Sequence, residues 1–282
     1  MKIGCHAVLY KEDIANKTDK TLKDLNYTGA EGIEFGSRFF NPENANTMLP
    51  KLEENSLEVF GLHKGCSLVD FVDDIEKCKS ELSEVAKILK QTSLTSRIIM
   101  TGQLPDMDLR DQEDFGEPRL INCSFVEKVA KNIEVVVKYI YEEYGIQVLY
   151  HNHFWEFKND NLIYNSLINN APSLNFALDI GWAISENYDY LSTIKKYPNR
   201  FYYLHIRDTN FIKMNNATCF DEKQNTYTEI GEGEVNFKPL LTCMNNIDNS
   251  ILVVEYEVGP VERDRYKNAI DYLNKVKKEI TK

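Results

Sequence analysis

The stretch IQVLYHNHFWEF, residues 146–157, places an apolar run directly before two histidines. The run follows Gly145, and glycine is the residue that most often ends a helix. A short apolar run bounded in this way is typical of a buried strand. Strands buried on both faces form parallel sheets, in which functional side chains gather beyond the carboxyl ends of the strands. We therefore interpret His151 and His153 as residues presented at that edge, and expect other strands to reach the same place.

Seven further short apolar segments alternate with helical patterns along the chain. The predicted strands cover residues 2–6, 33–35, 57–63, 97–100, 174–179, 201–206 and 251–256. The predicted helices cover residues 19–27, 50–55, 71–89, 125–144, 162–168, 190–197, 237–244 and 263–280. Eight evenly spaced strand-then-helix units favour an α/β fold, a (β/α)8 TIM barrel, as a single domain over residues 1–282. An open doubly wound sheet is the alternative, and it lacks a GxGxxG motif after the first strand.

Length and composition narrow the classes of protein that fit. The chain has 282 residues, enough for one α/β barrel, and its net charge of −11 disfavours a nucleic-acid partner. No stretch is long and apolar enough to span a bilayer, and the first residues lack the features of a signal peptide. The six cysteines include no CxxC pair, which favours reduced thiols. We expect a cytoplasmic protein that binds neither nucleic acid nor membrane; self-association stays open.

All five histidines lie at or beside the end of a predicted strand: His6, His63, His151, His153 and His205. Two carboxylates join them, because Asp179 ends the strand 174–179 and Glu255 lies in the strand 251–256. Any one of these residues alone can be a hydrogen-bonded polar group at the edge of the core. Together, facing one mouth of the barrel, they indicate a functional site.

The last four strands supply one metal-ligand side chain each, at corresponding depths: His151, Asp179, His205 and Glu255. Two imidazoles with two carboxylates suit one divalent ion of the Mn, Mg, Co or Zn type, and the absence of thiolates disfavours structural zinc. If the strand continues past His151, alternation places His153 on the same side, where we expect it to contact substrate.

Five motifs in this order resemble the sugar phosphate isomerase/epimerase superfamily, the xylose isomerase-like TIM barrels. They are GIEFG (32–36), YHNHFWEF (150–157), LDIGWA (178–183), HIRDT (205–209) with GEGEVNF (231–237), and VVEYE (253–257). The resemblance covers nearly the whole chain and implies a single metal at the four positions above. It also implies sugar or polyol contacts from His63, His153, Trp182 and Arg207. His6 and Glu34, on the first two strands, are further candidates for substrate contact.

The chain departs from the ketose 3-epimerases of this superfamily at the fifth strand. Their ligand there is a glutamate that doubles as a proton-transfer base, whereas His151 stands here, as in members resembling inosose dehydratase. Glu255 remains the candidate base, with His153, Glu156 or Glu34 as its partner, although both of these glutamates can instead be structural. The superfamily's metal-dependent apurinic-site endonucleases need more histidines, one of them where Trp182 stands, and are disfavoured.

The expected function is a divalent-metal-dependent isomerase or epimerase acting on a keto sugar or related polyol. A cation that chelates a carbonyl and an adjacent hydroxyl acidifies the C–H bond between them and stabilises an enediolate. Glu255 is expected to remove that proton. Loss of a β-hydroxyl would instead make the protein a dehydratase of a keto-inositol or keto-sugar, and a non-catalytic carbohydrate-binding barrel is a second alternative. The segments 102–120 and 207–236 are candidate lids.

Overall fold

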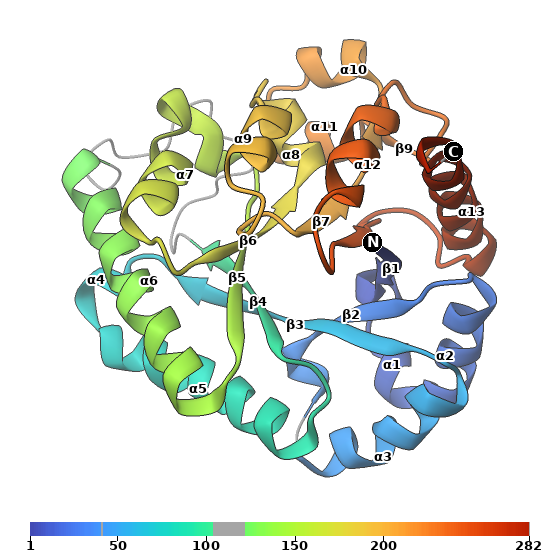
Figure 1. Ribbon diagram of the computed structural model, residues 1–282, viewed down its shortest axis with the longest axis horizontal. Coiled ribbons are helices and arrows are strands. Elements are labelled where there is room, and N and C mark those ends of the chain that lie inside the picture. The colour runs from blue at the N-terminus through green and yellow to red at the C-terminus, as the bar shows by residue number, and fades with distance from the viewer. Residues whose placement is uncertain (41, 104–121, 282) are drawn as a thin grey trace.

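Eight parallel strands close into a barrel at the centre of the computed structural model, which describes residues 1–40, 42–103 and 122–281 (Figure 1). Each strand pairs with the next along the chain, and the last pairs with the first. The predicted (β/α)8 TIM barrel is therefore confirmed. Its strands are β1 (Lys2–His6), β2 (Gly32–Gly36), β3 (Glu58–Ser67), β4 (Arg97–Gln103), β5 (Gln147–His151), β6 (Asn175–Asp179), β7 (Tyr203–Ile206) and β10 (Ile251–Val254).

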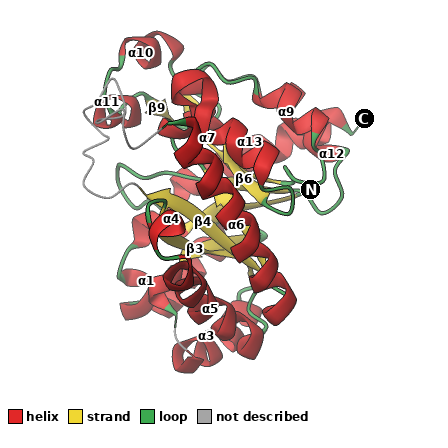
Figure 2. Ribbon diagram, turned by 90° about the vertical axis from the view of Figure 1, so that its left-hand side faces the viewer, coloured by secondary structure: helices red, strands yellow, loops and turns green. Residues whose placement is uncertain are grey.

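Helices surround the barrel and cover the outer faces of the strands (Figures 1 and 2). The α-helices are α1 (Asp13–Asn16), α2 (Thr18–Tyr27), α3 (Pro42–Glu54), α4 (Asp70–Asp73), α5 (Ile75–Thr92), α6 (Cys123–Tyr144), α7 (Lys158–Asn170), α8 (Ile180–Ser185), α9 (Tyr190–Lys196), α10 (Phe211–Asn216), α11 (Phe220–Gln224), α12 (Phe237–Asn245) and α13 (Arg263–Ile280). The 3-10 helices are η1 (Ala7–Tyr10), η2 (Ser37–Phe39) and η3 (Trp155–Phe157).

Helix α6 shows how local sequence fixes these elements. The Asn122 side chain accepts a hydrogen bond from the backbone N–H of Phe125 and caps the first turn. Gly145 ends the helix in the left-handed conformation, at φ 70°. Between the caps, Val129, Ile133, Ile140 and their neighbours at helical spacing are buried against the barrel. The chain then enters β5 directly, so the helix delivers the strand that carries His151.

The lower part of the barrel interior is filled by apolar side chains. They are Phe60, Ile99, Leu149, Ala177, Tyr203, Ile251 and Val253. Phe60 lies at a shift in the pairing between β2 and β3, and its ring fills the space beside Gly4 and Gly32. A Cβ atom at either glycine would collide with that ring, so these two glycines are required for the close approach.

Two helix predictions are wrong in detail. Pro50 lies inside α3 rather than in its first turn, because the helix begins at Pro42 and buries Ala45, Met48 and Leu52 on one face. Burial of that apolar face stabilises the helix across Pro50, which lacks one backbone hydrogen bond. The predicted helix 71–89 is two helices, since Asp74 leaves the helical conformation and its side chain caps α5.

Three strand ends also differ from the prediction. Strand β3 continues to Ser67, so His63 lies within the strand rather than at its end. Strand β5 stops at His151, which leaves His153 outside it. Strand β10 stops at Val254, paired with the last residue of β7, and Glu255 follows it. The N–H of Glu255 still donates to the carbonyl of Ile206 at 3.2 Å, so its side chain keeps the inward alternation of the strand.

Of the two candidate lids, the structure describes the second, residues 207–236, but little of the first. Of the segment 102–120, residues 104–120 lie outside the described residues. The segment 207–236 contains α10, α11 and a small antiparallel pair, β8 (Asp208–Thr209) with β9 (Tyr227–Thr228). The Asp208 carboxylate accepts hydrogen bonds from the N–H groups of Gly231, Gly233 and Val235 at 2.9–3.1 Å. These bonds hold the GEGEV segment to the start of the loop; its opening and closing stays a prediction.

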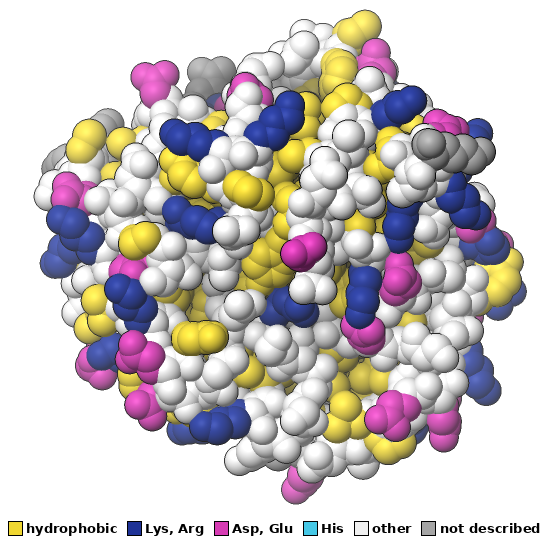
Figure 3. Space-filling view, viewed as in Figure 1, with side chains coloured by type: hydrophobic (Ala, Val, Ile, Leu, Met, Phe, Trp, Pro, Cys, Tyr) yellow, Lys and Arg dark blue, Asp and Glu magenta, His cyan; other side chains and the backbone are white. Residues whose placement is uncertain are grey.

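The outer surface carries charges of both signs. Acidic and basic side chains are interspersed on the face shown in Figure 3. Among the described residues, every helix is too short or too polar to cross a membrane.

Candidate metal centre

Every barrel strand contributes one polar side chain to a ring at the carboxyl end of the barrel. Most of these side chains lie two residues beyond an apolar residue of the lower interior, because side chains two apart on a strand face the same way. The ring consists of His6, Glu34, His63, Thr101, His151, Asp179, His205 and, directly after β10, Glu255. In TIM barrels this is the end at which active sites are built.

Four members of the ring converge closely enough to hold one metal ion. His151, Asp179, His205 and Glu255 each offer a ligand atom, and these atoms lie within 4.8 Å of one another. All four side chains are buried. The structure thus brings together the four residues that the sequence proposes as ligands. Donor atoms of one ion with bonds of about 2.0–2.2 Å lie about 3–4 Å apart, so small side-chain shifts would let these four share an ion.

His151 has the state that a ligand needs. Burial and the neighbouring His205 hold the pKa of His151 well below its usual value, so its imidazole is neutral. Among the described residues, its Nδ1 atom has no hydrogen-bond partner, although it is buried. A buried nitrogen without a partner is costly unless something binds it. The donor set therefore fits a divalent cation.

Arg207 offsets part of the negative charge of the site. Its Nε donates to Asp179 Oδ2 at 2.7 Å, and its Nη2 lies 3.1 Å from Glu255 Oε2. The other oxygen of Asp179 accepts from the N–H groups of Gly181 and Trp182 and so caps α8. Burial raises the pKa of Asp179 to about 6, against the opposing effect of Arg207. Asp179 is thus held in place by both of its oxygens.

His205 lies between two carboxylates. Its Nδ1 is 2.6 Å from Glu255 Oε2, and its Nε2 is 2.8 Å from Glu34 Oε2. Although burial lowers the pKa of His205, the two carboxylates outweigh it and raise that pKa well above its usual value. To act as a metal ligand, His205 would have to release the proton on the ring nitrogen that it offers, while its other nitrogen keeps its contact with a carboxylate. Such a carboxylate–histidine pair orients a metal ligand, so binding should release a proton.

Glu34, the ring residue from β2, contacts several neighbouring polar side chains. Its Oε1 lies 2.9 Å from His63 Nδ1, and its Oε2 accepts from the Tyr203 hydroxyl at 2.7 Å and contacts His205. Burial raises its pKa, but His205 and His6 outweigh that effect and hold the pKa of Glu34 well below its usual value. Glu34 is fully buried and does not line the cavity above the site, so it is placed to orient His205 rather than to touch substrate.

The family of the protein follows from comparison with known sequences. The family model of the xylose isomerase-like TIM barrels matches residues 22–276. The chain belongs to this family. A comparison with curated proteins gives no match.

Solved structures share the fold over the full length of this xylose isomerase-like barrel. A sugar phosphate isomerase/epimerase from Parabacteroides distasonis ATCC 8503 has a TM-score of 0.75 at 20% identity, covering 100% of this chain and 96% of that one. D-psicose 3-epimerase from Clostridium cellulolyticum H10, solved with D-tagatose, has a TM-score of 0.69 at 12% identity, covering 98% and 99%. The probable 3-DHS dehydratase AsbF from Bacillus anthracis has a TM-score of 0.69 at 16% identity, covering 97% and 99%. At these identities the likeness is one of fold.

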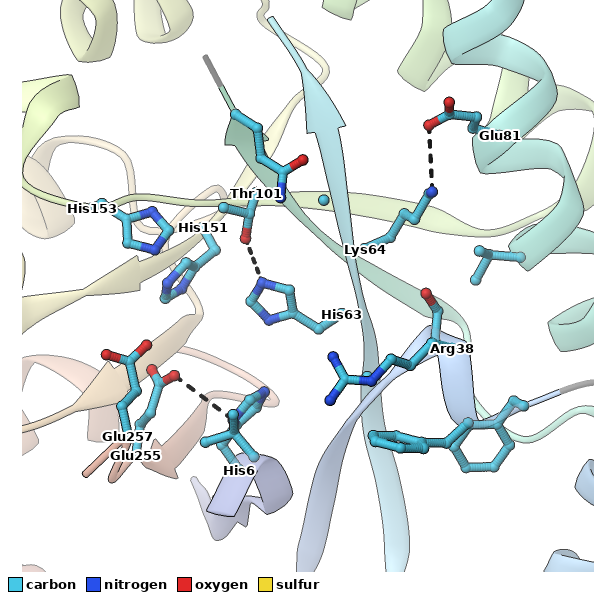
Figure 4. A pocket seen from close by; sticks show the side chains of 18 of the residues that line it. His6, Arg38, His63, Lys64, Glu81, Thr101, His151, His153, Glu255 and Glu257 are labelled. Carbon is cyan, nitrogen blue, oxygen red and sulfur yellow. Dashed lines mark hydrogen bonds and ion pairs between the residues drawn. The ribbon is translucent and has the colours of Figure 1, made fainter. Parts of the chain in front are cut away.

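A cavity of about 690 Å³ opens above the candidate metal centre of this xylose isomerase-like barrel. Figure 4 shows His6, His63, His151, His153 and Glu255 around it, and all five line it. Trp182 and Arg207, which were expected to contact sugar, are buried behind this lining. The guanidinium of Arg207 lies 5.4 Å from the Trp182 ring, so the two residues contact each other.

Two residues that the sequence did not single out have roles in the site. Trp155 lines the cavity, and its ring stacks on His153 with centroids 4.1 Å apart. Asn152 is fully buried and joins β5 to β6, because its side chain bonds both the N–H and the carbonyl of Asp179. The position of Asn152 between two histidines was the available signal, since a buried asparagine needs partners.

His153 and Glu156 have different access to the cavity. His153 lines it, and burial lowers the pKa of His153 to about 3, which keeps the imidazole neutral. Glu156 does not line it; its oxygens accept from the Tyr150 hydroxyl at 2.9 Å and from the His153 N–H at 2.8 Å. Burial raises the pKa of Glu156 to about 8, so at neutral pH the carboxyl is mostly protonated. Glu156 therefore supports the turn that carries His153.

Proposed function

We propose that this protein is an enzyme, a divalent-metal-dependent isomerase or epimerase of a keto sugar or related polyol, acting by proton transfer through an enediolate. The single observation that supports this most is the convergence of four ligand atoms within 4.8 Å beside a cavity of about 690 Å³. The cavity has the size expected for a small-molecule substrate. A bound divalent cation would supply the positive charge that acidifies a C–H bond beside a carbonyl.

Glu255 is the proposed base. It lines the cavity, and although burial raises its pKa, Arg207 and His205 outweigh burial and hold the pKa of Glu255 well below its usual value. The carboxylate is therefore ionised and ready to accept a proton at any working pH. A base with so low a pKa is weak, so it needs a substrate whose C–H bond is already acidified.

The group that returns the proton decides the outcome. If Glu255 delivers it to the neighbouring carbon on the same face, the reaction is an isomerisation. Return to the opposite face gives an epimer and requires a second group that can pass on a proton; His153 is the candidate, and because its imidazole is neutral it would relay a proton taken up from water. His153 lies just beyond the end of β5, which is separated from β10 by the two strands β6 and β7, and its ring stacks on Trp155. Trp155 also offers an apolar face for sugar C–H groups.

The decisive experiment is proton exchange in deuterated water. The purified protein, loaded with Mn²⁺ or Co²⁺, is incubated with a panel of ketohexoses, ketopentoses and keto-inositols, and deuterium incorporation is followed by NMR and mass spectrometry. We expect one substrate class to exchange a proton next to its carbonyl. Glu255→Gln should lower the exchange rate by at least about 10³-fold while the sugar still binds. Glu12→Gln, the same change at an exposed residue beyond β1 at the same end of the barrel, should leave the rate unchanged.

The products separate this proposal from its alternatives. An epimer or isomer carrying deuterium supports it, whereas a product that has lost water identifies a dehydratase built on the same centre. Sugar binding without exchange or turnover in any loaded form would support a carbohydrate-binding barrel. Unchanged exchange in Glu255→Gln would remove Glu255 from the mechanism.

A further inference from the structure

The other side of the ring contains a second group of potential ligands, separate from the four above. His6, Glu34 and His63 each offer an atom within 4.8 Å of the others. Glu34 Oε1 lies 2.9 Å from His63 Nδ1 and 3.3 Å from His6 Nε2. Neighbouring ligands of one cation with bonds of about 2.1 Å lie about 3.0–3.5 Å apart, so these distances match a shared ion. We propose that His6, Glu34 and His63 form a second divalent-cation site.

His6 supplies an independent reason. Its side chain is 7% exposed, and neither ring nitrogen makes a hydrogen bond with the described part of the chain. Nε2 points toward Glu34, and Nδ1 lies 3.7 Å from Glu255 Oε1, the contact drawn in Figure 4. His6 therefore lies within ion-pair distance of two carboxylates, but neither contact satisfies a ring nitrogen with a hydrogen bond. A cation on Nε2 would satisfy the nitrogen that faces Glu34.

Neighbouring residues hold the other two ligands in position. Thr101 Oγ1 hydrogen-bonds His63 Nε2, and this contact can fix the tautomer in which Nδ1 carries the lone pair. Tyr203 and His205 both bond Glu34 Oε2, so Oε1 is the oxygen left to face His63 and His6. Both imidazoles line the cavity, which leaves room for water or substrate in the remaining coordination positions.

The ligand types select the ion. Two imidazole nitrogens with one carboxylate oxygen favour Zn²⁺ or Co²⁺ over Mg²⁺ and Ca²⁺, which prefer oxygen ligands. The first centre, with two carboxylates, is less selective. Glu34 contacts His205 through Oε2, so the two sites would share one carboxylate–imidazole pair.

The test counts bound ions and does not depend on the enzyme's reaction. Metal-free protein is titrated with Co²⁺ and with Zn²⁺, and bound metal is measured by equilibrium dialysis, with Co²⁺ absorption as a second readout. We expect two equivalents in the wild type and one in His6→Gln and in His63→Gln. Gln103→Ala, which changes a neutral residue on β4 that lines the same cavity, should keep two equivalents. With Mg²⁺ we expect no more than one.

The variants also separate the two sites. His151→Ala should lose the first equivalent and keep the second, which an anomalous diffraction peak between His6, Glu34 and His63 would locate. If the wild type saturates at one equivalent, and that equivalent is lost in His151→Ala but kept in His6→Gln and His63→Gln, the second site does not exist. A protein that binds neither ion would overturn both sites. Circular dichroism and thermal unfolding of each variant establish that lost binding is not lost folding.

Discussion

The barrel interior contains two layers of side chains, and each residue of the upper layer lies two positions beyond a residue of the lower layer. The lower layer is apolar, whereas the upper layer is polar. Leu149, Ala177, Tyr203 and Val253 belong to the apolar lower layer. Two residues further along each strand stand the four candidate metal ligands, His151, Asp179, His205 and Glu255. The two residues of each pair lie two positions apart on one strand, so both side chains face the barrel axis. A shift of two residues along a strand therefore separates side chains that pack the core from side chains that can bind a metal. Substitutions in the two layers should have different effects.

The energetics of the layers differ in the same way. The lower layer stabilises the fold by removing apolar surface from water, at about 25 cal/mol per Å². The upper layer places carboxylates, imidazoles and Arg207 in a buried environment, where desolvation is unfavourable and must be offset by pairing. Its net contribution to stability therefore depends on keeping every partner in place.

The largest loss of stability is expected from Asp179→Ala in metal-free protein. The change leaves Arg207 with one fewer buried partner and uncaps α8, so the free energy of unfolding should fall by about 3 kcal/mol. Asp189→Ala is a matched control, because Asp189 also caps a helix, α9, but is exposed and lacks an ion pair among the described residues. The control should lose only about 1 kcal/mol in urea unfolding. Equal losses would show that the buried pair with Arg207 contributes nothing.

Leu149→Ala tests the lower layer directly. The cavity it creates should lower the free energy of unfolding by about 2–3 kcal/mol, while bound metal stays the same. His151→Leu, two residues along the strand, should show the reverse: metal binding is lost and stability of the metal-free protein changes by less than about 1 kcal/mol, since His151 Nδ1 bonds no described residue. Urea unfolding and metal analysis of both variants measure the contrast. Loss of metal in Leu149→Ala would mean that the layers are not separable.

The raised pKa of Glu156 predicts that the stability of the protein depends on pH. Its pKa is about 8 in the folded state, against an ordinary value of 4.5, so the folded protein keeps a proton that the unfolded chain loses. The contribution of Glu156 to the free energy of unfolding should therefore be largest below pH 4.5. It should fall as the pH rises toward 8, by at most about 1.4 kcal/mol per pH unit. Glu156→Gln removes this dependence, because an amide can accept from the His153 N–H and donate to the Tyr150 hydroxyl.

Urea unfolding of the wild type and Glu156→Gln between pH 5 and pH 8 measures the difference, with the variant relatively more stable at the higher pH. Parallel curves would show that Glu156 is not protonated in the folded protein.

Thr101→Val should give the smallest effect. Thr101 is the ring member without an ionisable side chain, and the change removes its hydrogen bond to His63, at a cost of about 1 kcal/mol in unfolding free energy. The first metal equivalent should be unaffected. A loss of more than about 2 kcal/mol would show that His63 depends on Thr101 for more than one hydrogen bond.

Much of the fold and the candidate site could be predicted from local sequence. The strand-then-helix pattern and Gly145 predict the barrel and the entry into β5, and the ligand set was proposed from strand-end histidines and carboxylates alone. The predicted sugar contact of Trp182 came from the family resemblance, and Trp182 does not line the cavity, because its side chain is fully buried and its ring packs near Arg207. Trp155, which does line the cavity, lies just past the end of β5 in a turn whose direction no local pattern specifies.

Sequence by itself determined the element types, the strand order and the residues delivered to the carboxyl end, because hydrophobic periodicity, helix caps and right-handed crossovers are local or topological rules. Only the tertiary structure decided how those residues interact. Glu34, given as a candidate substrate contact, proves to be a buried carboxylate shared by His63, Tyr203 and His205. The strand register, the shift that admits Phe60, and the closure of β10 onto β1 bring these side chains together from distant parts of the chain. Which carboxylate lies against which imidazole therefore depends on how the barrel closes.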